Sequence, residues 1–148
     1  MRVAIGSDHA GFDFKERIKT LLDEWKVPYD DLGTASHASV DYPDFAAAVA
    51  RRVAGGGADL GILVCGTGIG MAIAANKIRG IRAAVVWDET SARLSRQHND
   101  ANVMTIGGRT TPPDMVRGIV SVFLNTRFED GRHTLRLDKI AALERKDS

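Results

Sequence analysis

The apolar residues of this chain fall into two alternating patterns. Short apolar runs, typical of buried strands, occupy residues 2–6, 27–32 (the weakest), 61–65, 82–87 and 103–106. Apolar residues at helical spacing predict helices around residues 14–25, 45–53, 71–77, 89–98, 112–124 and in the tail. Strands and helices alternate without a linker or repeat, so we predict one domain over residues 1–148. Its fold class is α/β, a three-layer α/β/α sandwich with a five-stranded parallel, Rossmann-like sheet.

Composition and charge narrow the possible functions. The 148 residues are 44% hydrophobic and 26% charged, which fits a globular domain with a substantial core. A net charge of +1 gives no electrostatic case for nucleic acid or an anionic membrane, and no apolar stretch is long enough to span a bilayer. A single cysteine excludes an intrachain disulfide, and we expect no secretory leader because the first residues form a strand-like run without the apolar core of a signal peptide. We therefore expect a cytoplasmic protein.

The most informative stretch is GILVCGTGIG, residues 61–70. It reads as strand, tight turn and helix start, and in a parallel sheet such a turn lies at the carboxyl edge, where α/β proteins bind ligands. Its glycines let backbone N–H groups approach a ligand closely, and a helix start favours the thiolate form of Cys65. This combination predicts a nucleophile or base beside an anion site.

Three other interpretations of this stretch remain open. Cys65 could be a small buried hydrophobic residue. The turn could be a dinucleotide-binding fingerprint, with Asp88 as its acidic partner, but Met71 stands where the third glycine belongs. A phospho-receiver domain would also carry an acid such as Asp8 after the first strand, although its acceptor aspartate would replace Cys65.

Further candidates lie at strand ends. Asp8 and His9 follow the first strand, at the ligand-binding edge, although a helix N-cap and a surface histidine are equally simple roles for them. His98 and Asn99 belong to a polar run just before the fifth strand, which we expect at the same edge as Cys65 unless it is merely a solvated helix end.

The tail carries a possible phosphate clamp. Arg132 and Arg136 are four residues apart, so a helix would place both guanidinium groups on one face, as a clamp or as a solvated pair. No metal site is predicted, because the four histidines lack ligand spacing with one another or with Cys65.

Five linked motifs together resemble the type B ribose-5-phosphate isomerases over nearly the whole chain. They are DHAG at residues 8–11, DYP at 41–43, CGTGIG at 65–70, SRQHND at 95–100, and GRH at 131–133 with Arg136. The resemblance implies a strand order of 2-1-3-5-4 and a homodimer or a tetramer built from dimers. It also implies that the C-terminal helix, from about residue 134, packs on a neighbouring subunit, which supplies part of each site.

The resemblance also implies an activity, the interconversion of ribose 5-phosphate and ribulose 5-phosphate through an enediolate without metal or cofactor. Cys65 would move the proton between C1 and C2, His98 would open the furanose ring, and Thr67 completes the catalytic set. The implied substrate-binding residues are Asp8, His9, Tyr42, Gly66, Gly68, Ile69, Gly70, Asn99, Arg109, Arg132 and Arg136. Two alternatives stay open: an isomerase of a six-carbon sugar phosphate, such as allose or galactose 6-phosphate, and a non-enzymatic nucleotide- or flavin-binding module.

Overall fold

The computed structural model describes residues 1–146, and within them it contains five strands and six α-helices. The strands are β1 Val3–Ser7, β2 Tyr29–Asp31, β3 Leu60–Cys65, β4 Ala83–Val85 and β5 Val103–Gly107. The helices are α1 Phe12–Glu24, α2 Tyr42–Ala54, α3 Ile69–Ala75, α4 Glu89–Asn99, α5 Val116–Asn125 and α6 Arg132–Lys146, with a short 3₁₀ helix, η1 Pro113–Met115, before α5.

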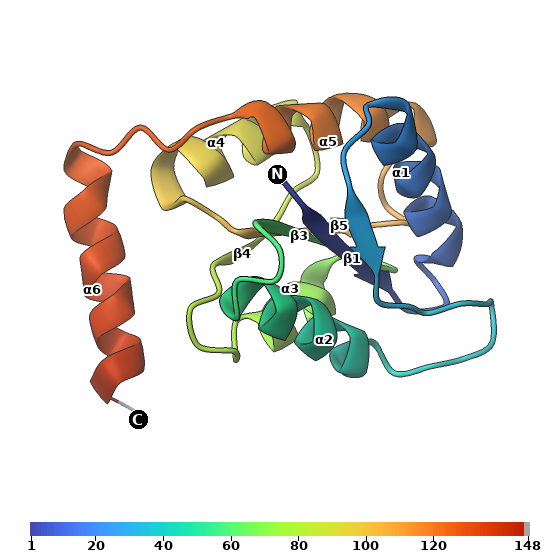
Figure 1. Cartoon of the computed structure of the whole chain (residues 1–148), viewed down its shortest axis with the longest axis horizontal. Helices are drawn as coiled ribbons and strands as arrows, with labels where there is room; N and C mark the ends of the chain where they lie inside the picture. The colour runs from blue at the N-terminus through green and yellow to red at the C-terminus, as the bar shows by residue number, and fades with distance from the viewer. Residues whose placement is uncertain (147–148) are drawn as a thin grey trace.

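The strands form one sheet in the order β2-β1-β3-β5-β4, and every pairing is parallel. The sheet is the middle layer, with α1, α4 and α5 packed on one face and α2 and α3 on the other (Figure 1). The predicted three-layer α/β/α sandwich and its strand order are confirmed.

Successive residues of the central strand face opposite layers, and this orients the site. Ile62 and Val64 of β3 belong to the core shared with α1 and α5, whereas Leu63 and Cys65 belong to the core shared with α2 and α3. Cys65 is therefore the last residue of a buried strand, and it faces the α2/α3 layer.

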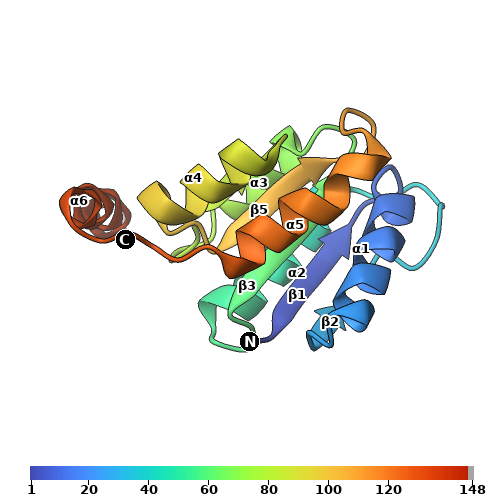
Figure 2. The same ribbon diagram turned by 90° about the horizontal axis from the view of Figure 1, so that it is seen from above.

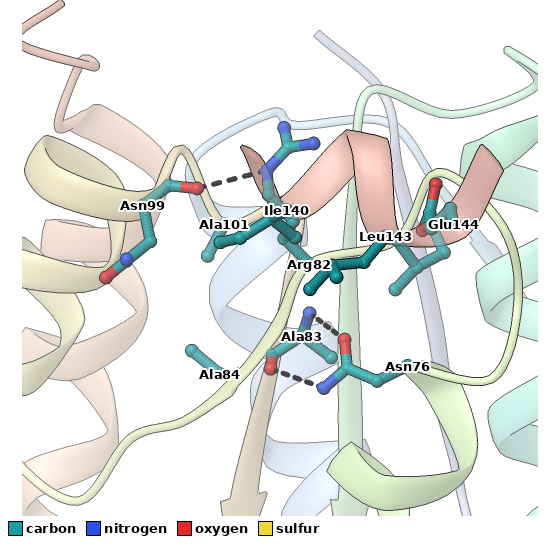
Figure 3. A pocket seen from close by; sticks show the side chains of 10 residues that line it. Asn76, Arg82, Ala83, Ala84, Asn99, Ala101, Ile140, Leu143 and Glu144 are labelled. Atoms are coloured by element: carbon teal, nitrogen blue, oxygen red, sulfur yellow. Dashed lines mark hydrogen bonds between the residues drawn. The ribbon is translucent and has the colours of Figure 1, made fainter. Parts of the chain in front are cut away.

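Two predicted strands are shorter than expected because they lie at the sheet edges. The run 27–32 contributes only Tyr29–Asp31, since Pro28 has no N–H for the ladder, and the run 82–87 contributes only Ala83–Val85. The side chain of Asn76 bonds both main-chain groups of Ala83, at 2.9 Å from its amide nitrogen and 2.8 Å from its oxygen (Figure 3). This pairing satisfies part of the β4 edge.

The C-terminal helix stands beside the layered body rather than inside it. It begins at Arg132, slightly earlier than expected, and lies next to the end of α4 (Figures 1 and 2). Leu135 and Leu143 of α6 are 63% and 61% exposed, so apolar surface of this helix has no partner within the described chain. None of the helices in residues 1–146 combines the length and the apolar character that crossing a membrane requires.

Candidate active site

The turn between β3 and α3 surrounds the Cys65 thiol with main-chain groups. Gly68 adopts the left-handed conformation, with φ of 80°, and its N–H donates to Cys65 Sγ at 3.2 Å. A hydrogen bond from a main-chain N–H favours a sulfur that carries negative charge. Since α3 has only seven residues, these loop N–H groups, rather than the dipole of a long helix, are the main donors near the sulfur.

A cavity of about 430 Å³ opens over this turn, lined by Asp8, Tyr42, Cys65, Gly66, Thr67, Ile69, Gly70 and Ile73. Gly70 is needed here because a Cβ would lie 2.6 Å from the ring of Tyr42. Tyr42 thus packs directly over the start of α3 and forms one wall. Asp8, which is buried, accepts a hydrogen bond from the Gly11 N–H at 3.0 Å and so has a fixed orientation at the end of β1.

The same turn presents unused hydrogen-bond donors to the cavity. Among residues 1–146, the N–H groups of Gly66 and Thr67 have no acceptor, while the carbonyl groups of Cys65 and Gly66 accept from Gly108 and Arg109 at 2.8 and 3.0 Å. With those carbonyls bonded to the segment after β5, the free N–H groups can serve an anion.

Two basic residues border this region. Arg109 packs against Gly66, where a Cβ would lie 3.4 Å from its guanidinium nitrogen. His9 accepts a hydrogen bond from the Val40 N–H on its Nδ1 at 3.2 Å, which leaves the proton of the neutral ring on Nε2. The structure therefore gathers most of the predicted site residues at one end of the sheet: Asp8, His9, Tyr42, Cys65, Gly66, Thr67, Gly68, Ile69, Gly70 and Arg109.

The expectation that His98 shares this edge with Cys65 is wrong. Helix α4 runs back against the strand direction, so residues just before β5 lie at the amino edge of the sheet. Asn102, which follows α4, accepts from the N–H of Gly61, and Gly61 is separated from Cys65 by almost the whole of β3, about 13 Å.

Asn99, Arg132 and Arg136 are likewise on the far side from Cys65. The Asn99 carbonyl accepts from Arg82 Nε at 3.0 Å and borders a pocket of about 490 Å³ between α4, β4 and α6 (Figure 3). Arg132 and Arg136 are on α6, which starts beside the end of α4. Within one chain these predicted site residues form a second group, separate from the Cys65 cavity.

His98 has a neighbour that the sequence spacing did not reveal. Its ring stacks on that of His133, with centroids 4.3 Å apart and planes inclined by 17°. Glu129 Oε2 lies 3.6 Å from His133 Nε2, a buried nitrogen without a hydrogen-bond partner among the described residues. Burial, followed by the charges of His98, Arg132 and Arg136, lowers the pKa of His133, although Glu129 opposes this.

The ligand atoms of His98, Glu129 and His133 lie within 4.8 Å of one another, close enough for a metal ion to be considered. The spacing of the histidines along the sequence did not predict this grouping, which forms because α6 brings residue 133 onto residue 98. However, the lone pair of each ring nitrogen lies in the plane of its ring. Because the two stacked rings are nearly parallel, both lone pairs cannot point at one ion. The two arginines nearby oppose a cation further, and the grouping fits a stacked imidazole pair better than a metal centre.

Comparisons with known proteins agree along the whole chain. Residues 3–140 match the family model Ribose/Galactose Isomerase. A putative sugar phosphate isomerase, YwlF, from Bacillus subtilis is 47% identical and covers 99% of both chains. Ribose-5-phosphate isomerase B from Escherichia coli is 47% identical over 98% of this chain and 97% of its own. The solved structure of Clostridium thermocellum ribose-5-phosphate isomerase B superposes with a TM-score of 0.99 at 46% identity, covering both chains completely.

Proposed function

This chain belongs to the ribose/galactose isomerase family and is a sugar-phosphate isomerase, and we propose that it interconverts ribose 5-phosphate and ribulose 5-phosphate. The observation that carries the proposal is the Cys65 thiol, which accepts the Gly68 N–H at 3.2 Å and borders a cavity supplied with free N–H groups. We propose that the reaction takes place in the cytoplasm, where a lone free thiol stays reduced.

Aldose–ketose exchange through an enediolate needs a base near neutrality and donors for the developing negative charge on oxygen. The Cys65 thiolate removes the proton from C2 of the open-chain aldose and returns it to C1. The N–H groups of Gly66 and Thr67, with the Thr67 hydroxyl, bind the enediolate oxygens in the cavity. These groups come from the chain itself, so the proposed reaction requires no cofactor or metal.

The remaining groups of the cavity bind the parts of the sugar that do not react. Asp8 and Tyr42, which line it, are positioned for sugar hydroxyl groups. His9 and Arg109 supply cationic or donor groups toward the phosphate, whose binding energy orients the reacting end. The role of His98 is to open the furanose ring by proton exchange, for which an imidazole is suited near pH 7.

His98 can take that role only if a second copy of the chain supplies it, because within one chain it lies at the other sheet edge. We propose a homodimer, alone or paired into a tetramer, in which each cavity receives His98, Asn99, Arg132 and Arg136 from the neighbour. Two apolar surfaces support this arrangement. Leu135 and Leu143 of α6 are exposed, and so are Ile69 and Ile73 beside the cavity, at 55% and 60%.

A six-carbon sugar phosphate is the alternative substrate, because the family name covers galactose as well as ribose. A nucleotide- or flavin-binding module is disfavoured by family membership and by Met71. This residue stands in place of the third glycine and is fully buried against the α2/α3 layer.

The test is a coupled assay of ribose 5-phosphate, allose 6-phosphate and galactose 6-phosphate with the purified full chain. We expect the highest kcat/KM for ribose 5-phosphate, unchanged by EDTA treatment. Cys65→Ala should lose at least about a thousandfold of kcat, since it removes the base, while still binding the sugar phosphate in a calorimetric titration. A higher kcat/KM for a hexose phosphate would show that the substrate is the six-carbon sugar phosphate instead. Near wild-type turnover of Cys65→Ala would show that Cys65 is not the base.

A further inference from the structure

One buried threonine contacts the turn between β3 and α3 from the β5 side. Thr105 lies in the middle of β5, paired with Leu63 of β3 and Val85 of β4, and its side chain is fully buried. Its hydroxyl donates to the carbonyl of Gly68 at 2.7 Å. Thr105 does not line the cavity, so it can affect the chemistry only through the turn.

The Gly68 residue links this hydroxyl to the reactive sulfur. Its carbonyl accepts from Thr105 on the strand side, and its N–H donates to Cys65 Sγ at 3.2 Å. The turn also sits tightly on β5, because a Cβ on Gly68 would lie 3.0 Å from the Ile106 backbone. Anchoring the carbonyl therefore restricts how the Gly68 backbone can rotate, and with it the direction of the N–H toward sulfur.

We propose that Thr105 is a positioning residue for Cys65: its hydroxyl holds Gly68 so that the Gly68 N–H stays directed at the thiolate. The catalytic part of this inference rests on the proposed function, in which Cys65 is the base. The geometric part concerns the reactivity of the thiol and can be measured without any sugar substrate.

The hydroxyl can be removed without disrupting the fold. The Gly68 carbonyl also accepts from the Ala72 N–H at 3.2 Å, so losing the Thr105 hydroxyl leaves no buried carbonyl without a partner. Valine has nearly the same shape as threonine, and it keeps the main-chain pairing of β5. Thr105→Val thus removes one hydrogen bond, and Thr105→Ser restores the hydroxyl while giving up only a methyl group.

The experiment compares wild type, Thr105→Val and Thr105→Ser, with Thr20→Val as the matched control. Thr20 is exposed on α1, and its hydroxyl also donates to a main-chain carbonyl, that of Glu16 at 3.2 Å, far from the turn. The first readout is the iodoacetamide alkylation rate at neutral pH, which reports Cys65 alone because the chain has one cysteine. The second is kcat and KM for ribose 5-phosphate.

For Thr105→Val we expect the alkylation rate to fall about threefold and kcat to fall about three- to tenfold, with KM changed less than about twofold. Thr105→Ser and Thr20→Val should both resemble wild type. The inference is overturned if Thr105→Val keeps the wild-type alkylation rate and kcat, or if Thr105→Val and Thr105→Ser lower them equally. If wild type isomerises no sugar phosphate, the proposed function fails, and the alkylation rates still decide the role of Thr105.

Discussion

Among single residues, the proposed separate roles of Cys65 in proton transfer and His98 in ring opening have the clearest chemical consequence. The reacting C1–C2 unit of ribose 5-phosphate is masked until its furanose ring opens. Ribulose 5-phosphate cannot close such a ring, because the hydroxyl that it would use carries the phosphate. Ring opening and proton transfer can therefore be separated by the choice of substrate.

We predict that His98→Asn loses most net isomerisation in both directions but still exchanges a C1 proton of ribulose 5-phosphate with solvent deuterium. That exchange needs only Cys65 and the N–H groups of its turn, so Cys65→Ala should lose it. Deuterium incorporation followed by NMR measures both variants. Equal loss of exchange in both would mean that His98 takes part in the proton transfer itself.

At the scale of elements, a partly buried ion pair connects α1 to the segment that precedes the loop before Tyr42. The Lys15 ammonium, fully buried, donates to both carboxylate oxygens of Asp31, at 2.7 and 2.9 Å, and to the carbonyl of Thr34 at 2.7 Å. Asp31 also pairs with Lys19 at 2.8 Å. Burial raises the pKa of Asp31, but the bonds from Lys15, Lys19 and the Gly33 N–H outweigh it, and the pKa is lowered overall.

We predict that Lys15→Met lowers the free energy of unfolding by about 3 kcal/mol. It removes both Lys15 bonds to Asp31, which keeps only Lys19 and the Gly33 N–H, and it leaves the buried Thr34 carbonyl without its Lys15 donor. Lys19→Met is the matched control and should cost less than about 1 kcal/mol, since Lys15 keeps Asp31 paired. Urea unfolding at neutral pH measures both. Equal losses of unfolding free energy in the two variants would show that the burial of Lys15 does not determine its contribution to stability.

The sign of the pH dependence follows from the lowered pKa of Asp31. Its ion pairs stabilise the fold above the ordinary value of 3.8, and this contribution is lost as the pH falls through the lower folded value. The difference in stability between wild type and Lys15→Met should therefore narrow in strong acid.

The helix α6 contributes the proposed phosphate clamp. We predict that Arg132→Ala or Arg136→Ala raises KM for ribose 5-phosphate about tenfold or more, since each loses a charge-assisted bond to phosphate. Arg117→Ala is the control, because Arg117 pairs with Glu24 at 2.9 Å on the surface and lines neither the Cys65 cavity nor the pocket beside α6. Changes in KM below twofold at both α6 positions would show that these arginines are solvated surface residues and do not bind the phosphate.

At the scale of the whole molecule, the proposed mechanism requires Cys65 and His98 to come from two copies of the chain, because within one chain they lie at opposite sheet edges. Mixing inactive Cys65→Ala and His98→Asn chains should therefore restore activity. In a dimer made of one chain of each kind, one site receives a wild-type Cys65 and a wild-type His98, and the other receives neither.

Random exchange makes half of the dimers mixed, so we predict about a quarter of wild-type activity after co-refolding, from one intact site in each mixed dimer. Size-exclusion chromatography should show a dimer or larger. A mixture that stays inactive, although mixed dimers are detected by mass, would place both residues of each site in a single chain.

The sequence by itself determined the features that depend on neighbours along the chain. Apolar runs and helical spacing predicted the strand–helix alternation, and alternation requires a parallel sheet covered on both faces. The glycines after Cys65 located the turn, because its left-handed residue and its close approach to Tyr42 both exclude a side chain. The lengths of the edge strands were missed, since they depend on pairing partners.

Only the tertiary structure decided which of the candidates meet. His98 was assigned to the wrong edge because residues before and after a parallel strand lie at opposite ends of the sheet. Its stacking on His133, the burial of Lys15 beside Asp31 and the Thr105 bond to Gly68 join residues far apart in the chain. The physical reason is that periodicity records which face of an element is apolar, whereas contacts between polar side chains depend on how the elements pack and on the direction in which each one runs.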